Sequence, residues 1–292
     1  MFSEVRQAIL PLALRRTGGR GDLERAGLLV ESLERHWRDP LPLELLIVAP
    51  ARDVDLLRAD LPHATNICIT VRPESDFFTA FGPFYFMPGW FRQQVIKLYI
   101  PALLDFGGYL TLDSDIICVG DFDARTFVRD GRAVSRWEPK SGQDWWRNAA
   151  ELVGVPYDRK GHGLSVTPNI LHGDLASQAL VHVANGAADA TAALCLWIAR
   201  KIGAVAWTEY SLYTSVAELK GNLLAYHHHW DTCYGGDVHL FSDRSCVWKA
   251  EDFARMATLP QGSDPGGKFI VVQSHARIPV ERVRKYSLQF AG

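Results

Sequence analysis

The sequence contains no hydrophobic run long enough to span a membrane. Its longest apolar runs, residues 45–49 and 187–198, fall short of the ~20 residues that a membrane-spanning helix needs. The start, residues 1–4, also lacks the charged region and following apolar segment of a secretory signal. We therefore expect a cytoplasmic protein.

The sequence is also poor in cysteine and in net charge. Its five cysteines are odd in number and share no metal-binding spacing, which predicts reduced and mostly buried thiols. A net charge of −2 over 292 residues gives no basic field that would attract nucleic acid or anionic lipid, so neither is expected as a main partner. Local basic side chains can still hold a phosphate.

Several well-known site motifs are missing as well. The sequence has no Walker A loop, no zinc-protease helix and no nucleophile elbow. Residues 105–107 read Asp-Phe-Gly, as in kinases, but no glycine-rich loop accompanies them, so we interpret them as a turn. His227, His228 and His229 are adjacent and cannot all face one ion, which favours a loop with surface or acceptor-contacting imidazoles.

Strand-like and helix-like segments alternate in the first half of the chain. Apolar runs predict strands over residues 8–15, 43–49 and 66–71, and helical spacing predicts helices over residues 22–37 and 52–60. This order implies a parallel sheet with helices on its faces. An aromatic loop over residues 77–90, a helix over residues 91–104 and a further strand follow.

The second half has a less regular pattern. Strands are expected over residues 133–137, 165–172, 204–207 and 268–273, and helical pattern fills residues 173–200 and 209–219. No segment has the composition of a linker, and no repeat of about 20–50 residues is present. We therefore expect a single α/β domain over residues 1–292 with a mixed central sheet.

The most informative motif is Asp113-Ser114-Asp115. It follows a glycine pair and a continuous apolar strand, unlike the other two Asp-x-Asp triplets, which begin at Asp53 and Asp121. In extended backbone, residues i and i+2 point the same way, so both carboxylates would face one side of a strand end. Such oxygens suit a hard divalent cation that keeps open positions for phosphate oxygens. The alternative is a solvated strand end without a ligand.

Further polar side chains could join this motif. The preceding helix carries Gln93 and Lys97 on one face, four residues apart. Because ligands of open α/β sheets bind beyond the carboxyl ends of strands, these side chains could reach a base, a ribose or a phosphate; the alternative is a solvated helix face. His275 ends the last predicted strand and could complete a metal shell, although a lone histidine is usually structural.

Glu209 is the candidate general base. It follows Thr208, which can cap the predicted helix, and from that first turn it could deprotonate an acceptor hydroxyl. A carboxylate at this position is also favoured by the helix dipole, without any further function. Trp207, Tyr210 and Tyr213 could form a sugar-binding wall, or they could belong to the core.

Together these segments resemble glycosyltransferases of the GT-A fold, a Rossmann-like nucleotide-sugar transferase fold. The resemblance rests on residues 93–98, on the glycine pair 107–108 and on the strand leading to Asp113 and Asp115. The chain is also similar to a bacterial family described mainly as a domain of unknown function and grouped with glycosyltransferases. That likeness lies in Trp207-Thr208-Glu209-Tyr210 and Gln273-Ser274-His275.

The resemblance implies a nucleotide-diphospho-sugar donor, with UDP as the first choice, and a Mn²⁺ or Mg²⁺ ion held by Asp115. Asp113 would contact the ribose or the metal, and His275 would be a late metal ligand. Glu209 would lie on the acceptor side, as the base of an inverting reaction or as a positioning group in a retaining one. In one departure, residues 14–17 replace a familiar donor-base signature, which leaves the base and the sugar open.

We therefore expect a metal-dependent glycosyltransferase in which residues 1–120 bind the nucleotide-sugar and residues 121–292 bind the acceptor. The acceptor would be a bacterial surface glycan or glycolipid, which allows a peripheral place at the inner membrane. Candidate acceptor contacts are Trp137, Trp145 and Trp146, with core packing as the alternative. Two other functions stay open: a nucleotidyltransferase, and an inactive glycan- or nucleotide-binding module of the same fold.

Overall fold

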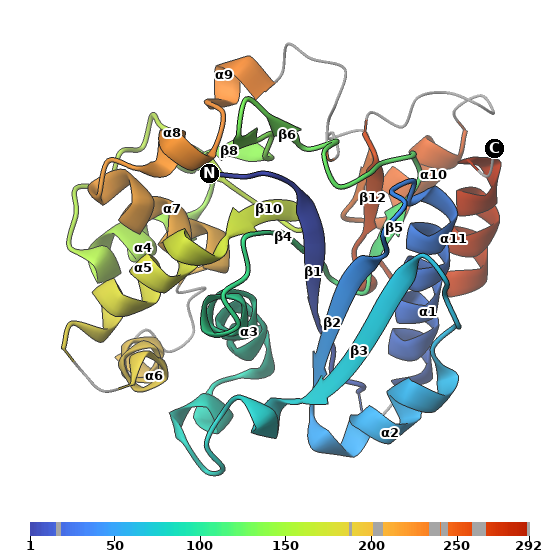
Figure 1. Ribbon diagram of the computed structural model, residues 1–292, viewed down its shortest axis with the longest axis horizontal. Helices are drawn as coiled ribbons and strands as arrows, with labels where there is room; N and C mark the ends of the chain where they lie inside the picture. Colours follow the sequence, from blue (N-terminus) through green and yellow to red (C-terminus); the bar gives the residue numbers. More distant parts are fainter. Residues whose placement is uncertain are drawn as a thin grey trace.

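A five-stranded sheet lies at the centre of the computed structural model, which describes residues 1–15, 19–186, 189–200, 207–233, 240, 245–258 and 267–290 (Figure 1). Its strands, in spatial order, are β10 (Asn169–His172), β4 (Gly108–Thr111), β1 (Val5–Pro11), β2 (Leu43–Ala49) and β3 (Ile67–Pro73). β10 is antiparallel to β4, and the other neighbouring strands are parallel. The α/β class and the mixed central sheet are therefore confirmed.

Helices cover both faces of this sheet. One face carries α1 (Gly19–His36) and α2 (Ala51–Asp60), and the other carries α3 (Gly89–Leu103), α5 (Gly173–Ala184) and α7 (Glu209–Leu219) (Figure 1). Side chains alternate along a strand, so β2 sends Leu46 and Val48 to the α3 side and Leu45 and Ile47 to the α1 side. Burial on both faces explains why the sequence of β2 is almost continuously apolar.

A smaller sheet lies beside the central one. Its strands, in spatial order, are β11 (Cys246–Val247), β12 (Phe269–Val272) and β5 (Ile116–Cys118). The helices α10 (Ala250–Ala257) and α11 (Val280–Ser287) share a third apolar core with these strands. β5 follows β4 after only four residues, so the chain passes from the central sheet to the smaller sheet at residues 112–115. The Asp-x-Asp motif lies at this crossing.

The remaining elements are short and mostly belong to the second half. They are β6 (Val128–Arg129), β7 (Arg132–Ala133), β8 (Trp137–Pro139), α4 (Asp144–Val153), β9 (His162–Leu164), α6 (Ala190–Arg200), α8 (Leu223–Tyr226) and α9 (Trp230–Cys233). Within the described residues, 3-10 turns lie at Glu74–Asp76, Pro83–Phe86, Lys140–Gly142, Ser274–Ala276 and Leu288–Phe290. β8 and β9 form a separate two-stranded antiparallel sheet, with α4 between them in the sequence.

The predicted elements are largely present, but several ends are different. β1 covers residues 5–11 instead of 8–15, because it pairs with β4 from Val5 onward. The strand predicted over 133–137 is divided between β7 and β8, and only residues 169–172 of the strand predicted over 165–172 are extended. The strand predicted over 204–207 lies mostly outside the described residues.

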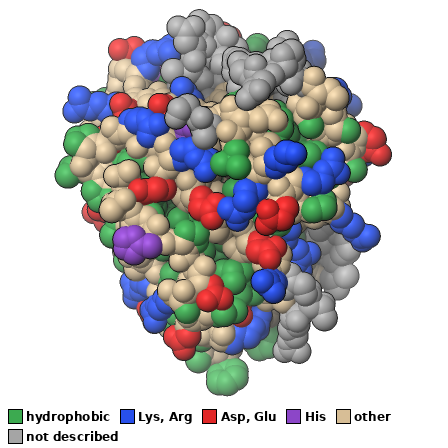
Figure 2. Space-filling view, turned by 90° about the vertical axis from the view of Figure 1, so that its right-hand side faces the viewer, with side chains coloured by type: hydrophobic (Ala, Val, Ile, Leu, Met, Phe, Trp, Pro, Cys, Tyr) green, Lys and Arg blue, Asp and Glu red, His purple; other side chains and the backbone are tan. Residues whose placement is uncertain are grey.

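The surface shows no strong separation of charge on the side formed by α1 and α11. Figure 2 shows Lys and Arg side chains interspersed with Asp and Glu side chains there. Of the helices in the described parts of the chain, none is both long and apolar enough to cross a membrane.

Candidate active site

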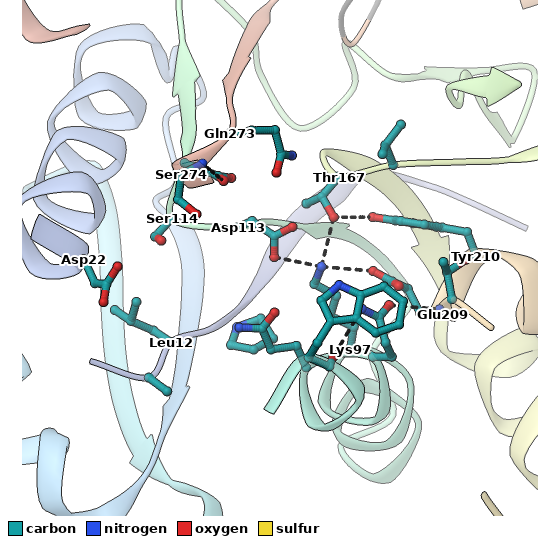
Figure 3. A pocket seen from close by; sticks show the side chains of 18 of the residues that line it. Leu12, Asp22, Lys97, Asp113, Ser114, Thr167, Glu209, Tyr210, Gln273 and Ser274 are labelled. Atoms are coloured by element: carbon teal, nitrogen blue, oxygen red, sulfur yellow. Dashed lines mark hydrogen bonds and ion pairs between the residues drawn. The ribbon is translucent and has the colours of Figure 1, made fainter. Parts of the chain in front are cut away.

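The ammonium group of Lys97 lies at the centre of the site. Lys97 is only 2% exposed. Its Nζ lies 2.9 Å from each of Asp113 Oδ1, Glu209 Oε1 and Thr167 Oγ1 (Figure 3). Burial alone would lower the pKa of Lys97, yet Asp113 and Glu209 raise it above its ordinary value. The lysine therefore stays charged and joins α3 to the turn after β4 and to the start of α7.

The start of α7 is fixed by caps from its own residues and from α3. Thr208 is the N-cap, and its hydroxyl accepts a hydrogen bond from Ser211 N at 3.0 Å. Gln94 Oε1 accepts a hydrogen bond from the backbone N of Glu209 at 3.1 Å. These bonds satisfy amide groups that a helix start leaves free, so they hold Glu209 against Lys97. The predicted helix over 209–219 and its Thr208 cap are confirmed.

Asp115 is the second carboxylate of the crossing between the sheets. Its Oδ2 accepts a hydrogen bond from Ser274 N at 3.0 Å, at the end of β12. Burial, together with the negative charge of Asp113, raises its pKa from an ordinary 3.8 to about 7. A single backbone donor compensates this carboxylate poorly, so a cation beside it would be favoured.

The motif does not lie on a strand end. β4 stops at Thr111, Ser114 and Asp115 form a turn, and β5 begins at Ile116. The prediction that Asp113 and Asp115 lie in extended backbone is therefore wrong. Both side chains still reach one cavity, because the turn carries them between the two sheets.

A chain of hydroxyl groups continues the site from Lys97 into the core. Tyr210 OH lies 2.9 Å from Thr167 Oγ1 and 2.6 Å from Thr111 Oγ1. Val166, next to Thr167, has a φ of +44°, a region that a β-branched residue rarely adopts. Val166 belongs to the segment 165–167, which lines the cavity. A strained backbone conformation of this kind persists only where the surrounding structure holds it in place.

These residues surround a polar cavity of about 450 Å³. Figure 3 shows Leu12 and Asp22 on one side of Lys97, and Glu209 and Tyr210 on the other. The first side adjoins the carboxyl ends of β1 and β4, where open α/β sheets bind ligands. A volume of this size accommodates a small-molecule ligand.

The first side also contains a charged cluster around Asp22. Arg15 and Arg25 lie 2.7 Å and 2.6 Å from Asp22 Oδ1, and the backbone N of Arg15 donates to Asp22 Oδ2 at 3.1 Å. Asp22 lies inside α1, which begins at Gly19, three residues before the predicted start of this helix. Asp22 and Arg15 line the cavity, and their pairing leaves them little net charge.

The structure brings most of the predicted site residues together. Five of the predicted site residues line the cavity: Gln93, Lys97, Asp113, Asp115 and Glu209. Lys97 is buried and paired, so the alternative of a solvated helix face is wrong for it. His275 is exposed and does not line the cavity, where Gln273 and Ser274 lie instead. In the described parts of the chain, no three His, Cys, Asp or Glu side chains form a metal-binding group, so the metal roles stay predictions.

The aromatic candidates divide between core and cavity. Trp207 and Tyr213 are fully buried and belong to the core, whereas Tyr210 lines the cavity. Trp137 and Trp146 are also buried, which leaves Trp145 as the cavity-lining member of that group.

The three adjacent histidines separate in the structure. His227 is fully buried between Ser135 Oγ and Tyr213 OH, each 2.8 Å from its ring. Burial lowers its pKa to about 3, so it is a neutral core residue. His228 is buried and His229 exposed, so the predicted loop of surface imidazoles applies to His229 alone.

The other two Asp-x-Asp triplets lie away from the cavity. Asp53 Oδ2 accepts a hydrogen bond from Leu14 N at 3.1 Å, and Asp55 is fully exposed. Asp121 contacts His36 and Arg38, each at 2.9 Å. Neither triplet lines the cavity.

Gln94 and Thr167 are site residues that the sequence did not indicate. Gln94 adjoins Gln93 in a helix that is buried on nearly all sides, so helical periodicity could not select it. Thr167 lies 70 residues from Lys97 in an irregular segment without a motif. Only the folded chain shows that the two contact Glu209 and Lys97.

Comparison with known proteins shows a family and a likeness to solved structures. The model of DUF6492, a family of unknown function, matches residues 3–291. The crystal structure of mouse xyloside xylosyltransferase 1 in its apo form is similar over 94% of this chain and 99% of that chain, with 12% identity and a TM-score of 0.48. No curated protein matches the sequence.

We expect Lys97→Met to destabilise the protein by about 3–5 kcal/mol, the scale for removing one partner of a buried ion pair. Its loss leaves Glu209 buried without a cation. Denaturant unfolding would measure this, with the exposed Lys220→Met as the matched control. Adding Glu209→Gln should recover part of the loss. If Lys97→Met is no worse than Lys220→Met, the ion pair is not a structural constraint.

We expect the stability of Asp115→Asn relative to the unaltered protein to rise with pH. The folded-state pKa of Asp115 is about 7, above its ordinary 3.8, so the folded protein holds a proton that the unfolded chain has released. The native carboxylate therefore lowers the free energy of unfolding most above about pH 7. Melting temperatures of both proteins in chelator, between pH 5 and 8.5, would show a gap that widens to about pH 7 and then levels off. A gap independent of pH contradicts this.

Proposed function

The chain belongs to the DUF6492 family, whose function is unknown, and we propose that it is a metal-dependent glycosyltransferase of the GT-A type. The observation that supports this most is the arrangement around Lys97. On one side, Asp113 and Asp115 offer carboxylate oxygens at the crossing of the two sheets, and on the other Glu209 opens to the same cavity. A transferase of this type needs one group that stabilises a charged leaving group and another that acts on the acceptor hydroxyl.

The chemistry of the donor set fits a hard divalent cation. The side chain of Asp113 is 33% exposed, and its Oδ1 is paired with Lys97. Asp115 Oδ2 accepts a hydrogen bond from the backbone N of Ser274. Two carboxylates that repel each other beside a cavity are stabilised by Mn²⁺ or Mg²⁺, both of which accept oxygen ligands. A bound cation would neutralise charge on a diphosphate leaving group. Asp113 and Asp115 would hold it, and Asp113 could also contact the ribose.

Glu209 is proposed to act on the acceptor. Burial raises its pKa, although Lys97 opposes this shift. In an inverting reaction an acceptor oxygen would bond to the anomeric carbon, the bond from that carbon to the diphosphate would break, and Glu209 would take the hydroxyl proton. In a retaining reaction Glu209 would orient the acceptor instead. Lys97 fixes the carboxylate in both cases.

The roles of the cavity sides follow from this assignment. The nucleotide would lie beside Leu12, Arg15 and Gln93, near the carboxyl ends of β1 and β4. The resemblance to GT-A enzymes makes UDP the first choice. A nucleotidyltransferase would instead consume a nucleoside triphosphate and release pyrophosphate, and a binding module would hold ligand without turnover.

We expect UDP or GDP to raise the melting temperature by a few degrees when Mn²⁺ or Mg²⁺ is present and by almost nothing in chelator. The diphosphate and the carboxylates of Asp113 and Asp115 repel each other unless a cation lies between them. A ligand at 100 times its Kd stabilises by about 2.7 kcal/mol. Thermal unfolding with each nucleotide and each cation, followed by assays for release of UDP from UDP-sugars and of pyrophosphate from triphosphates, separates the three functions.

Matched variants sharpen this experiment. Asp115→Asn should lose the cation-dependent shift, whereas Asp55→Asn, which alters a fully exposed aspartate of another Asp-x-Asp triplet, should keep it. A His275→Ala variant decides whether that exposed ring contributes to the cation site. If no nucleoside diphosphate stabilises the protein with either cation, the nucleotide-sugar proposal is wrong.

Glu209→Gln should lower sugar transfer by roughly 10²-fold or more, the usual scale for losing a general base, while nucleotide affinity changes little. The amide cannot take the proton, yet it can still accept a hydrogen bond from Lys97. Parallel measurement of turnover and of the cation-dependent nucleotide shift tests this. Equal losses in both readouts would assign Glu209 a structural role.

A further inference from the structure

Two arginines and one aspartate form a cluster where β1 leads into α1. Arg15 and Asp22 line the cavity, and Figure 3 shows Asp22 near Leu12, at the opposite end of the drawn site from Glu209. Arg25, about one turn further along α1, contacts the same carboxylate at 2.6 Å. The groups proposed to carry out the transfer include none of these three residues.

Asp22 holds the guanidinium group of Arg15 at two points. Arg15 Nε donates to Asp22 Oδ2 at 3.0 Å, and Arg15 Nη2 donates to Asp22 Oδ1 at 2.7 Å. A two-point pair of this kind fixes the plane of the guanidinium as well as its position. The carboxylate is fixed in turn, because its side chain is only 10% exposed and also accepts hydrogen bonds from Arg25 and from the backbone N of Arg15.

The cluster keeps a positive charge at the cavity. Burial alone would raise the pKa of Asp22, yet hydrogen bonds from Arg15 and Arg25 lower it below its ordinary value, so the carboxylate stays charged. One carboxylate neutralises only one of the two guanidinium groups. The side chain of Arg15 is 58% exposed, whereas that of Arg25 is 17% exposed. Arg15 therefore offers the cavity a flat, fixed and cationic surface.

The chemistry of this surface suits an aromatic ring. The edge of Arg15 formed by Nε and Nη2 is paired with Asp22, which leaves the faces of the guanidinium to a ligand. Such a face stacks on aromatic rings, and its charge is attracted to their π electrons. Pro11 and Leu12, at the end of β1, add apolar side chains to the lining of the cavity. Apolar neighbours favour a ring over a phosphate, which carries its own charge.

Two partly exposed tryptophans line the same cavity, but they lie on other elements. Trp90 shares a face of α3 with Gln94, four residues later, whose side chain contacts Glu209. Trp248 follows β11, and the carbonyl just before it accepts a hydrogen bond from Gln273, in the segment that contacts the Asp-x-Asp motif. One indole thus adjoins the proposed acceptor group and the other the proposed cation site. The cluster at the end of β1 lies where open α/β sheets bind their ligands.

We propose that the guanidinium of Arg15, held flat by Asp22, is the surface on which the nucleobase of the donor stacks. This inference rests on the proposed function, because it names the residue that binds the base of the nucleotide. The contact uses the face that all bases have in common, so purine and pyrimidine nucleotides both gain from it. Asp22 is a positioning residue, since it acts through the guanidinium.

The experiment compares ligands with and without a base. Calorimetric titration with UDP, GDP, ADP and inorganic pyrophosphate, in Mg²⁺ or Mn²⁺, measures the affinity that the base adds. Arg15→Ala should raise the Kd of the bound nucleotides by roughly tenfold or more, the scale for losing the stacking partner of one base, and leave that of pyrophosphate nearly unchanged. Arg15→Lys should resemble Arg15→Ala, because it keeps the charge and loses the plane.

The matched control is Arg52→Ala, which should leave every Kd unchanged. The side chain of Arg52 is also 58% exposed and is also paired with a buried aspartate, Asp53, but it does not line the cavity. Asp22→Ala should weaken nucleotide binding, and Asp22→Asn, which keeps an acceptor oxygen, should weaken it less. Melting curves without ligand show whether each variant folds.

The outcomes separate this inference from the proposed function. Equal losses for nucleotide and pyrophosphate in Arg15→Ala would make Arg15 a phosphate ligand, and unchanged binding would remove it from the site. Either result overturns the inference and leaves the transferase in place. The inference also fails if Trp90→Leu or Trp248→Leu removes the contribution of the base while Arg15→Ala does not. If no nucleoside diphosphate binds with either cation, the proposed function is wrong and the inference falls with it.

Discussion

The buried ammonium group of Lys97 is the interaction on which the rest of the site depends. A charge taken out of water is expensive unless opposite charges and hydrogen bonds replace the solvent. Asp113, Glu209 and Thr167 provide that replacement, each at 2.9 Å. These residues come from the turn after β4, the start of α7 and the segment before β10. Folding both halves of the chain around one lysine therefore assembles the site.

The crossing between the two sheets explains why the carboxylates lie where they do. β4 belongs to the central sheet and β5 to the smaller one, so the four residues between them must leave one sheet and enter the other. Asp113 turns to Lys97, and Asp115 turns to the backbone of Ser274 at the end of β12. One carboxylate is neutralised by a lysine and the other has only a backbone donor. Burial, together with the negative charge of Asp113, raises the pKa of Asp115.

The second half of the chain supplies the other wall of the cavity through irregular segments. The segment 165–167 includes Val166 with a positive φ, and Glu138 on β8 accepts a hydrogen bond from Trp146 of α4. Rigid elements support these contacts, since α4 and α7 pack against each other in one apolar core.

The sequence by itself determined the parallel βαβαβ order and the helix beginning after Thr208, and it selected Asp113, Asp115 and Glu209, which line one cavity. These features depend on apolar periodicity and capping, which act over a few neighbouring residues. Tertiary structure alone decided that Lys97 is a buried counter-ion, that Trp145 and not Trp146 lines the cavity, and that His275 stays outside it. Thr167 and Gln94 became visible only in the fold. Their contacts join residues 70 and 115 positions apart, and such contacts arise from the packing of whole elements, which no local pattern records.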